Sequence, residues 1–258
     1  MALAVAVQTP YPGLRPFRED EADCFFGQDV PLTDLRDRLY ADHFVAILGL
    51  SGCGKSSLLK AGLLAEIRPK RIRGPRSRWL IGYMKPGGDP LQNLVSAVLE
   101  VNSQIRAQTA RLGEDLSAVP ATDMTGAFLL DGHGLARYGH EAPLASGQDI
   151  LIVVDQFEEL FRYKRDSATH RDKDRAALFV QLLLEAVRDR ESRISVVITM
   201  RSEFLGDCAL FFGLAEQVNQ GTFLLPRMTR DQIQEVITGP AEMGGVRYRP
   251  ERDTATAQ

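Results

Sequence analysis

Short apolar runs separated by longer amphipathic stretches form the main hydrophobic pattern of the chain. Residues 150–154 are all apolar, and residues 194–200 form a similar run. Both runs are rich in β-branched residues, which is typical of strands that are buried on both faces, as in a parallel sheet. The pattern predicts five strands in all, with the other three at 43–48, 79–84 and 221–225.

The stretches between these runs repeat apolar residues at the three- and four-residue spacing of a helix. Two of them also begin with an N-cap signal, because Asp89 is followed by a proline and Thr229 offers a capping hydroxyl. Alternating strands and helices favour an α/β fold with a mostly parallel sheet. We expect helices over 29–42, 57–66, 89 to about 105, 123–130, 174–190 and 229–237.

Residues 49–56, Gly-Leu-Ser-Gly-Cys-Gly-Lys-Ser, match the Walker A phosphate-binding pattern at every fixed position. Glycines allow positive φ and a close approach of backbone N–H groups to an anion, and the following helix adds the positive end of its dipole. A chance glycine-rich turn is the alternative, and the strand and helix predicted on either side argue against it. The candidate nucleotide-binding residues here are Gly49, Ser51, Gly52, Cys53, Gly54, Lys55, Ser56 and Ser57.

An acid, Asp155, directly follows the apolar run 150–154, in the position called Walker B. Open α/β sheets bind ligands beyond the carboxyl ends of their strands, so Asp155 is expected to face the same crevice as the phosphate loop. Magnesium prefers hard oxygen ligands and usually takes one or two protein groups together with phosphate oxygens. Ser56 and Asp155 are therefore the candidate magnesium ligands.

Two glutamates follow Asp155 at a distance that suits a residue polarising the attacking water. Glu158 is the first choice and Glu159 the second, because one of them can instead occupy the first turn of the next helix, where the dipole favours acids. Arg201 follows the apolar run 194–200 and offers a bidentate contact to the γ-phosphate. Its competing role is an ion pair with Glu203 or Glu158.

The N-terminal residues 9–17 are expected to form an extended arm along the domain, because their prolines exclude a regular helix or a central strand. An arm of this kind can cover a bound base. Phe25 and Phe26 follow, and they are either core residues or neighbours of the adenine ring, where an aromatic face stabilises beyond its area burial. Phe26 is therefore a further candidate nucleotide-binding residue.

The composition is ordinary for an α/β protein, with 258 residues, 44% hydrophobic and 25% charged. The net charge of −3 gives no reason to expect a nucleic-acid or membrane partner. The basic residues 68–78 could contact a polyanion, but a solvated loop is the simpler interpretation. Three cysteines without paired spacing, with no signal segment or membrane-length apolar run, favour the cytoplasm. We expect His133 and His140 at the surface rather than on a metal.

With these residues assembled, the chain resembles the STAND class of signalling NTPases. It is most similar to the novel STAND family, which is often found in front of WD-type propeller repeats in bacteria. The phosphate loop alone is shared by many NTPases, whereas its combination with Asp-Gln-Phe-Glu-Glu at 155–159 is much more specific. The resemblance covers residues 11 to 246 and is carried by the segments 11–17, 25–27, 49–64, 153–161 and 199–205.

The resemblance implies a P-loop NTPase three-layer sandwich with a mostly parallel five-stranded sheet, plus the start of a C-terminal helical subdomain. It also implies a nucleotide-dependent switch whose ligands are ATP or ADP and Mg²⁺. The ATP-bound form would self-associate and engage an effector in signalling or defence. By similarity Asp155 binds magnesium, Glu158 and Glu159 are the catalytic acids, and Arg201 senses the γ-phosphate. The chain has Gln28 where the family has an arginine, so any contact made by that arginine is missing.

We expect three regions: an arm and helix that cover the nucleotide site (1–42), the NTPase core (43–226), and the start of a truncated helical lid with an unstructured tail (227–258). Effector or sensor domains would then lie on a longer chain or a neighbouring gene product. A slowly hydrolysing switch ATPase that forms a homo-oligomer with ATP is the first hypothesis. A nucleotide-binding scaffold without turnover and an AAA+-like ATPase that acts with nucleic acid are the alternatives.

Overall fold

Five parallel strands form the centre of the protein in a computed structural model that describes residues 10–68, 79–112, 131–166 and 170–243. The sheet order is β2-β3-β4-β1-β5, and every neighbouring pair is parallel, so the sheet is all-parallel rather than mostly parallel. Each strand lies within about a residue of an apolar run in the sequence. The strands are β1 Phe44–Gly49, β2 Trp79–Met84, β3 Asp149–Val154, β4 Ile194–Arg201 and β5 Thr222–Leu224.

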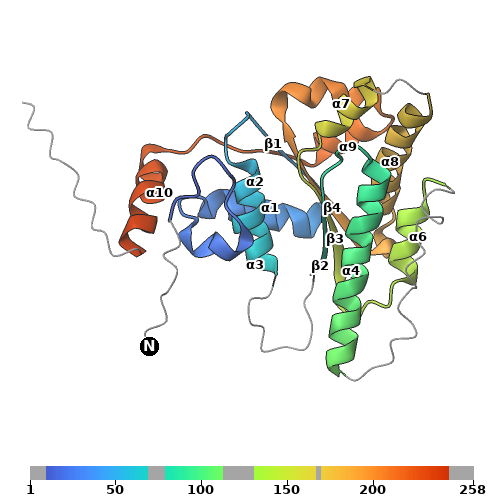
Figure 1. Cartoon of the computed structure of the whole chain (residues 1–258), viewed down its shortest axis with the longest axis horizontal. Helices are drawn as coiled ribbons and strands as arrows, with labels where there is room; N and C mark the ends of the chain where they lie inside the picture. Colours follow the sequence, from blue (N-terminus) through green and yellow to red (C-terminus); the bar gives the residue numbers. More distant parts are fainter. Residues whose placement is uncertain (1–9, 69–78, 113–130, 167–169, 244–258) are drawn as a thin grey trace, which may run out of the picture.

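Helices cover both faces of the sheet, giving three layers (Figure 1). One face carries α1 (Asp29–Asp42) and the helix after the phosphate loop, which comprises α2 (Lys55–Ser57), a π-helical segment (Leu58–Leu64) and α3 (Ala65–Ile67). The other face carries the longer helices. They are α4 (Pro90–Leu112), α6 (Gly134–Glu141), α7 (Glu159–Asp166), α8 (His170–Arg188) and α9 (Leu214–Gln220).

Alternation along the strands builds a separate core on each face, because successive side chains point to opposite sides of a sheet. In β1, Val45 and Ile47 pack with residues of α1 and of the helix after the phosphate loop, whereas Ala46 and Leu48 pack with α4 and α8. These four side chains are at most 2% exposed. Burial on both faces explains why the strands read as continuous apolar runs in the sequence.

The helix N-termini follow the capping residues that the sequence predicts. The side chain of Asp89 accepts from the backbone N–H of Gln92 at 3.1 Å, and the hydroxyl of Thr229 accepts from the N–H of Gln232 at 3.3 Å. Gln232 in turn accepts from the N–H of Thr229 at 2.8 Å, which completes a reciprocal capping box. Both predicted caps are therefore confirmed.

The C-terminal helix ends are less well predicted. Helix α4 continues to Leu112 rather than to about residue 105, and α10 (Arg230–Met243) continues through Pro240. The proline is buried, and the Cα of Gly239 lies against the ring of Phe26, so packing favours the helix where the sequence pattern fades. The helix predicted at 123–130 and the predicted unstructured tail lie outside the described residues.

The N-terminal arm and α10 lie together, on the phosphate-loop side of the molecule (Figure 1). The arm leads into a 3-10 segment, Glu19–Cys24, and two further 3-10 segments, Arg190–Ser192 and Ser202–Leu210, flank β4. Within the described ranges no helix is both long and apolar enough to cross a membrane.

Candidate functional site

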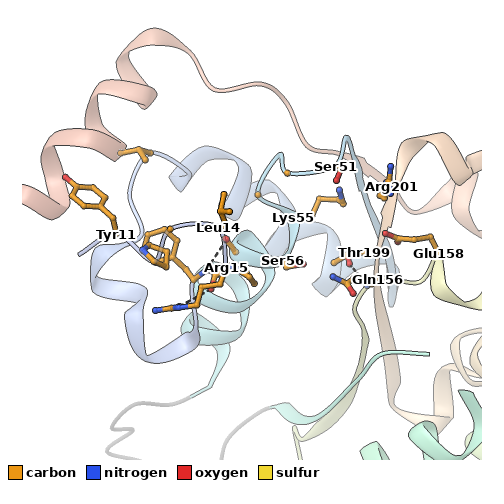
Figure 2. Close-up of a pocket in the computed structure, with 18 residues that line it drawn as sticks. Tyr11, Leu14, Arg15, Ser51, Lys55, Ser56, Gln156, Glu158, Thr199 and Arg201 are labelled. Carbon is orange, nitrogen blue, oxygen red and sulfur yellow. Dashed lines mark hydrogen bonds between the residues drawn. The ribbon is translucent and has the colours of Figure 1, made fainter. Parts of the chain in front are cut away.

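The carboxyl ends of three neighbouring strands bring the candidate residues together. Strand β4 pairs with β1 on one side and with β3 on the other, and Arg201 at its end is in register with Gly49. The phosphate loop, Asp155 and Arg201 therefore meet at one edge of the sheet, as parallel strands require. Figure 2 shows Ser51, Lys55, Glu158 and Arg201 grouped around this edge.

The phosphate loop has the backbone that an anion site needs. Gly52 and Gly54 have φ of 74° and 97°, and a Cβ on either one would meet nothing within 4 Å, so the backbone faces open space there. Gly54 is the N-cap of α2, which places the helix N-terminus beside this space. A Cβ on Gly49 would lie 2.6 Å from the sulfur of Cys53, so a larger residue here would displace the Cys53 side chain.

Lys55 crosses the inside of the loop and is 9% exposed. Its Nζ donates to the carbonyl oxygens of Gly49 at 2.9 Å and Leu50 at 2.7 Å. Its third N–H faces the sulfur of Cys53 at 3.8 Å. Sulfur is a weak acceptor, so a phosphate oxygen would be a stronger partner for this third donor.

Asp155 accepts hydrogen bonds at both carboxylate oxygens and is 1% exposed. Its Oδ1 accepts from Ser56 Oγ at 2.9 Å and from Thr199 Oγ1 at 2.6 Å, and its Oδ2 accepts from the hydroxyl of Tyr83 at 2.6 Å. The structure thus brings the two predicted magnesium ligands, Ser56 and Asp155, into direct contact.

Two hard oxygen donors next to a phosphate loop fit Mg²⁺, which takes most of its remaining ligands from phosphate and water. No group of three or more His, Cys, Asp or Glu side chains that could hold a metal by themselves occurs in the described ranges.

Burial raises the pKa of Tyr83 far above its usual range, and the neighbouring Asp155 charge raises it further. The phenol therefore keeps its proton at ordinary pH and acts as a hydrogen-bond donor to the carboxylate.

The two glutamates have different surroundings. Glu158 lines the cavity beside the loop, is 7% exposed, and its Oε2 has no hydrogen-bond partner among the described residues. The Oε2 of Glu159 instead accepts from the N–H of Gly87 at 3.0 Å, and Glu159 does not line the cavity. The geometry thus favours Glu158 as the residue that faces a ligand, with Glu159 at the start of α7.

A strained turn after β3 determines where the two glutamate side chains lie. Gln156 has φ of 59°, which is uncommon for a residue with a side chain. Thr199 holds the turn, because its Oγ1 accepts from the N–H of Gln156 at 2.9 Å and its carbonyl accepts from the N–H of Phe157 at 2.8 Å. The chain reverses sharply after β3, and Glu158 comes to line the cavity.

Arg201 also lines the cavity, and its Nη2 lies 2.5 Å from Glu203 Oε1. The ion pair with Glu203 that the sequence offered as a competing role is thus present. The Nε of Arg201 is buried without a hydrogen-bond partner among the described residues, so the guanidinium retains an unused donor. The two roles are compatible because a guanidinium has five N–H donors.

The cavity has a volume of about 580 Å³, within the range of small-molecule sites. Its walls come from the phosphate loop, the turn after β3, the end of β4, the N-terminal arm and α10 (Figure 2). The arm is attached to the loop helix, because the N–H of Phe17 donates to Ser57 Oγ at 3.2 Å. The predicted nucleotide-binding residues that line the cavity are Ser51, Gly52, Gly54, Lys55, Ser56 and Ser57.

Three predicted nucleotide-binding residues do not line the cavity. Gly49 and Cys53 belong to the phosphate loop but pack against each other rather than lining the cavity. Phe26 packs on Gly239, where an added Cβ would lie 2.8 Å from its ring, so the structure places Phe26 at the contact with α10 rather than beside a base. The apolar packing of a large ring against a glycine explains this placement.

Sequence reasoning missed Thr199, Tyr83 and Gln156. The first two lie near the carboxyl ends of strands that neighbour β3, so the rule that located Asp155 also points to them. No sequence pattern points to Gln156, because its role in the turn comes from its positive φ and not from its side chain.

The remaining candidates lie away from the cavity. His140 Nε2 is 2.7 Å from Asp189 Oδ2, and the side chain of His133 is 65% exposed. Of the basic residues 68–78, only Arg68 is described; it pairs with Glu19 at 3.3 Å and Glu100 at 3.4 Å.

Comparison with solved structures finds similar chains at low sequence identity. A Walker-type ATPase of Pyrococcus abyssi is similar with a TM-score of 0.53 and 16% identity, over 92% of this chain and 63% of that chain. Cdc6p from Pyrobaculum aerophilum has a TM-score of 0.43 and 14% identity, over 91% of this chain and 52% of its own. The chain thus spans less than two thirds of the length of either protein.

The first likeness supports the shared α/β fold with its parallel sheet. No curated protein matches the chain. The sequence profile described as Novel STAND NTPase 1 matches residues 10–257, which is nearly the whole chain. The chain therefore belongs to the Novel STAND NTPase 1 family of P-loop NTPases.

Proposed function

We propose that this STAND-type NTPase binds ATP with Mg²⁺, hydrolyses it slowly, and couples its nucleotide state to self-association and signalling. One observation carries the proposal: the phosphate loop, the Ser56–Asp155 pair and the cavity-facing Glu158 converge at one edge of the sheet. A triphosphate brings the negative charge that the loop amides and Lys55 can bind.

Each side chain has a role in this proposal. Lys55 contacts the β- and γ-phosphates, and Ser56 and Asp155 hold Mg²⁺, which supplies charge neutralisation when it is bound. Glu158 accepts the proton of the water that attacks the γ-phosphorus, and Arg201 contacts the γ-phosphate. The unpartnered Glu158 oxygen and the buried Arg201 Nε support the last two assignments.

Mutation of Lys55 tests nucleotide binding. In Lys55→Ala the charge-assisted contacts are lost, and contacts of this kind contribute about 1.5 to 3 kcal/mol, or about ten- to a hundredfold in affinity. Lys164→Ala is the matched control, because Lys164 donates to the carbonyl of Leu210 and does not line the cavity. Calorimetry with ATP and Mg²⁺ should show weaker binding only in Lys55→Ala, and equal affinity in the two variants would overturn the proposal.

The switch part of the proposal rests on family membership. It is supported by the cavity wall, since the arm and Val236 of α10 face the same space as the phosphate loop. A nucleotide in the cavity would therefore contact both segments. Light scattering with ATP and with ADP tests the self-association: a larger particle with ATP alone supports it, and the same mass in both states contradicts it.

A further inference from the structure

In the described part of the chain, Tyr83 is the one residue whose side chain donates a hydrogen bond to Oδ2 of Asp155. Its hydroxyl lies 2.6 Å from Oδ2, whereas Ser56 and Thr199 both donate to Oδ1. Tyr83 itself does not line the cavity. It can therefore influence a bound ligand only through the side chain that it contacts.

Both the backbone and the ring of Tyr83 are held in place by neighbouring residues. Its backbone is in register with Val153 of β3, and its N–H donates to Glu100 Oε2 at 3.4 Å. The Nζ of Lys60 lies 5.0 Å from the centre of the ring, a cation–π distance. The hydroxyl thus reaches Asp155 from a position that is fixed by the sheet and by the helix after the phosphate loop.

The residues after Tyr83 hold the rest of the acidic turn. The carbonyl of Met84 accepts from the N–H of Asp155 at 2.9 Å, and Lys85 Nζ donates to Gln156 Oε1 at 2.9 Å. The N–H of Gly87 donates to Glu159 at 3.0 Å. Residues 83–87 therefore contact the turn 155–159 at four points, and Tyr83 provides the contact to the carboxylate.

We propose that Tyr83 is a positioning residue for magnesium binding, holding the Asp155 carboxylate in the orientation that the metal requires. The inference rests on the proposed function. Partners that orient a ligating carboxylate matter in metal sites generally, and their loss lowers metal affinity or activity by about 10- to 100-fold. Tyr83 suits this role because a protonated phenol donates to Oδ2 and leaves Oδ1 on the side of Ser56.

Replacement of the hydroxyl tests the inference. Tyr83→Phe keeps the ring and removes the donor. Tyr138→Phe is the matched control, because Tyr138, which is buried, likewise donates its hydroxyl to a side chain, that of Asn102 at 2.8 Å, in another part of the protein. The readout is the binding of a fluorescent ATP analogue across a Mg²⁺ titration and in EDTA. We expect Tyr83→Phe to raise the half-saturating Mg²⁺ concentration about tenfold, with the affinity in EDTA unchanged and Tyr138→Phe like wild type.

A double-mutant cycle separates positioning from a general effect on folding. In an Asp155→Asn background Tyr83→Phe should add no further loss, since Tyr83 acts through that carboxylate. An additive loss there, or an unchanged Mg²⁺ dependence in Tyr83→Phe while Ser56→Ala shifts it, would overturn the inference and leave the proposed function intact. Wild-type protein without Mg²⁺-dependent nucleotide binding would instead overturn both.

Discussion

Substituting Glu158 by glutamine separates the two glutamates of the acidic turn. The amide has the same shape as the carboxylate but cannot accept the proton of an attacking water. Among the described residues Glu158 Oε2 has no hydrogen-bond partner to lose, and the side chain lines the cavity at 7% exposure. Binding should therefore persist while hydrolysis stops. Glu159→Gln is the matched control, because an amide oxygen can still accept from Gly87.

The expected size of the effect follows from the role. Proton transfer by a positioned side chain contributes about 10²- to 10⁴-fold to a rate, which at about 1.36 kcal/mol per tenfold is about 2.7 to 5.4 kcal/mol of activation free energy. In Glu159→Gln the change is confined to one hydrogen bond, worth about 0.5 to 1.5 kcal/mol. The rate in that variant should fall by about tenfold or less.

Single-turnover hydrolysis of ATP, followed with excess protein over nucleotide, measures the chemical step without product release. Calorimetry on the same samples checks that ATP still binds. The reasoning is refuted if Glu158→Gln hydrolyses ATP at the wild-type rate, or if Glu159→Gln alone abolishes turnover.

Two further predictions concern the segment before α1. Gly27→Ala should lower the free energy of unfolding by about 1 to 3 kcal/mol in urea denaturation, because the new Cβ would lie 2.8 Å from a carbonyl oxygen of α10. Gly13→Ala is the control: Gly13 has the same φ of 72° but open space around it, so this variant should lower the free energy of unfolding by clearly less. Hydrogen bonds from Arg15 lower the pKa of Glu21 to about 2. Stability should therefore hold above about pH 4.5 and decline toward pH 2, and Glu21→Gln should remove this part of the pH dependence.

Much of the sheet could be predicted from the sequence because its strands are buried on both faces. In β3 every residue after Asp149 is apolar and buried, so the strand lies within one residue of the apolar run 150–154. The C-terminal ends of α4 and α10 could not be predicted in the same way. Contacts such as that between Gly239 and Phe26 decide where a helix ends, and these contacts join residues far apart in the sequence.

The candidate site shows the same division. The contact of Ser56 with Asp155 follows from strand direction and loop chemistry, which are local features of the sequence. Which of Glu158 and Glu159 lines the cavity depends on the left-handed backbone at Gln156. A glutamine in the sequence does not predict that conformation. Tyr83 looks like a core residue in an apolar strand, and only the parallel pairing of β2 with β3 brings it to Asp155.

The hydroxyl of Tyr11 lies 2.5 Å from the carbonyl of Ile237, so the arm and α10, 226 positions apart, are joined across the cavity wall. A displacement of α10 would therefore act on the arm through this hydrogen bond as well as on β5 through the chain. Because the arm lines the cavity, the position of α10 and the shape of the cavity are linked.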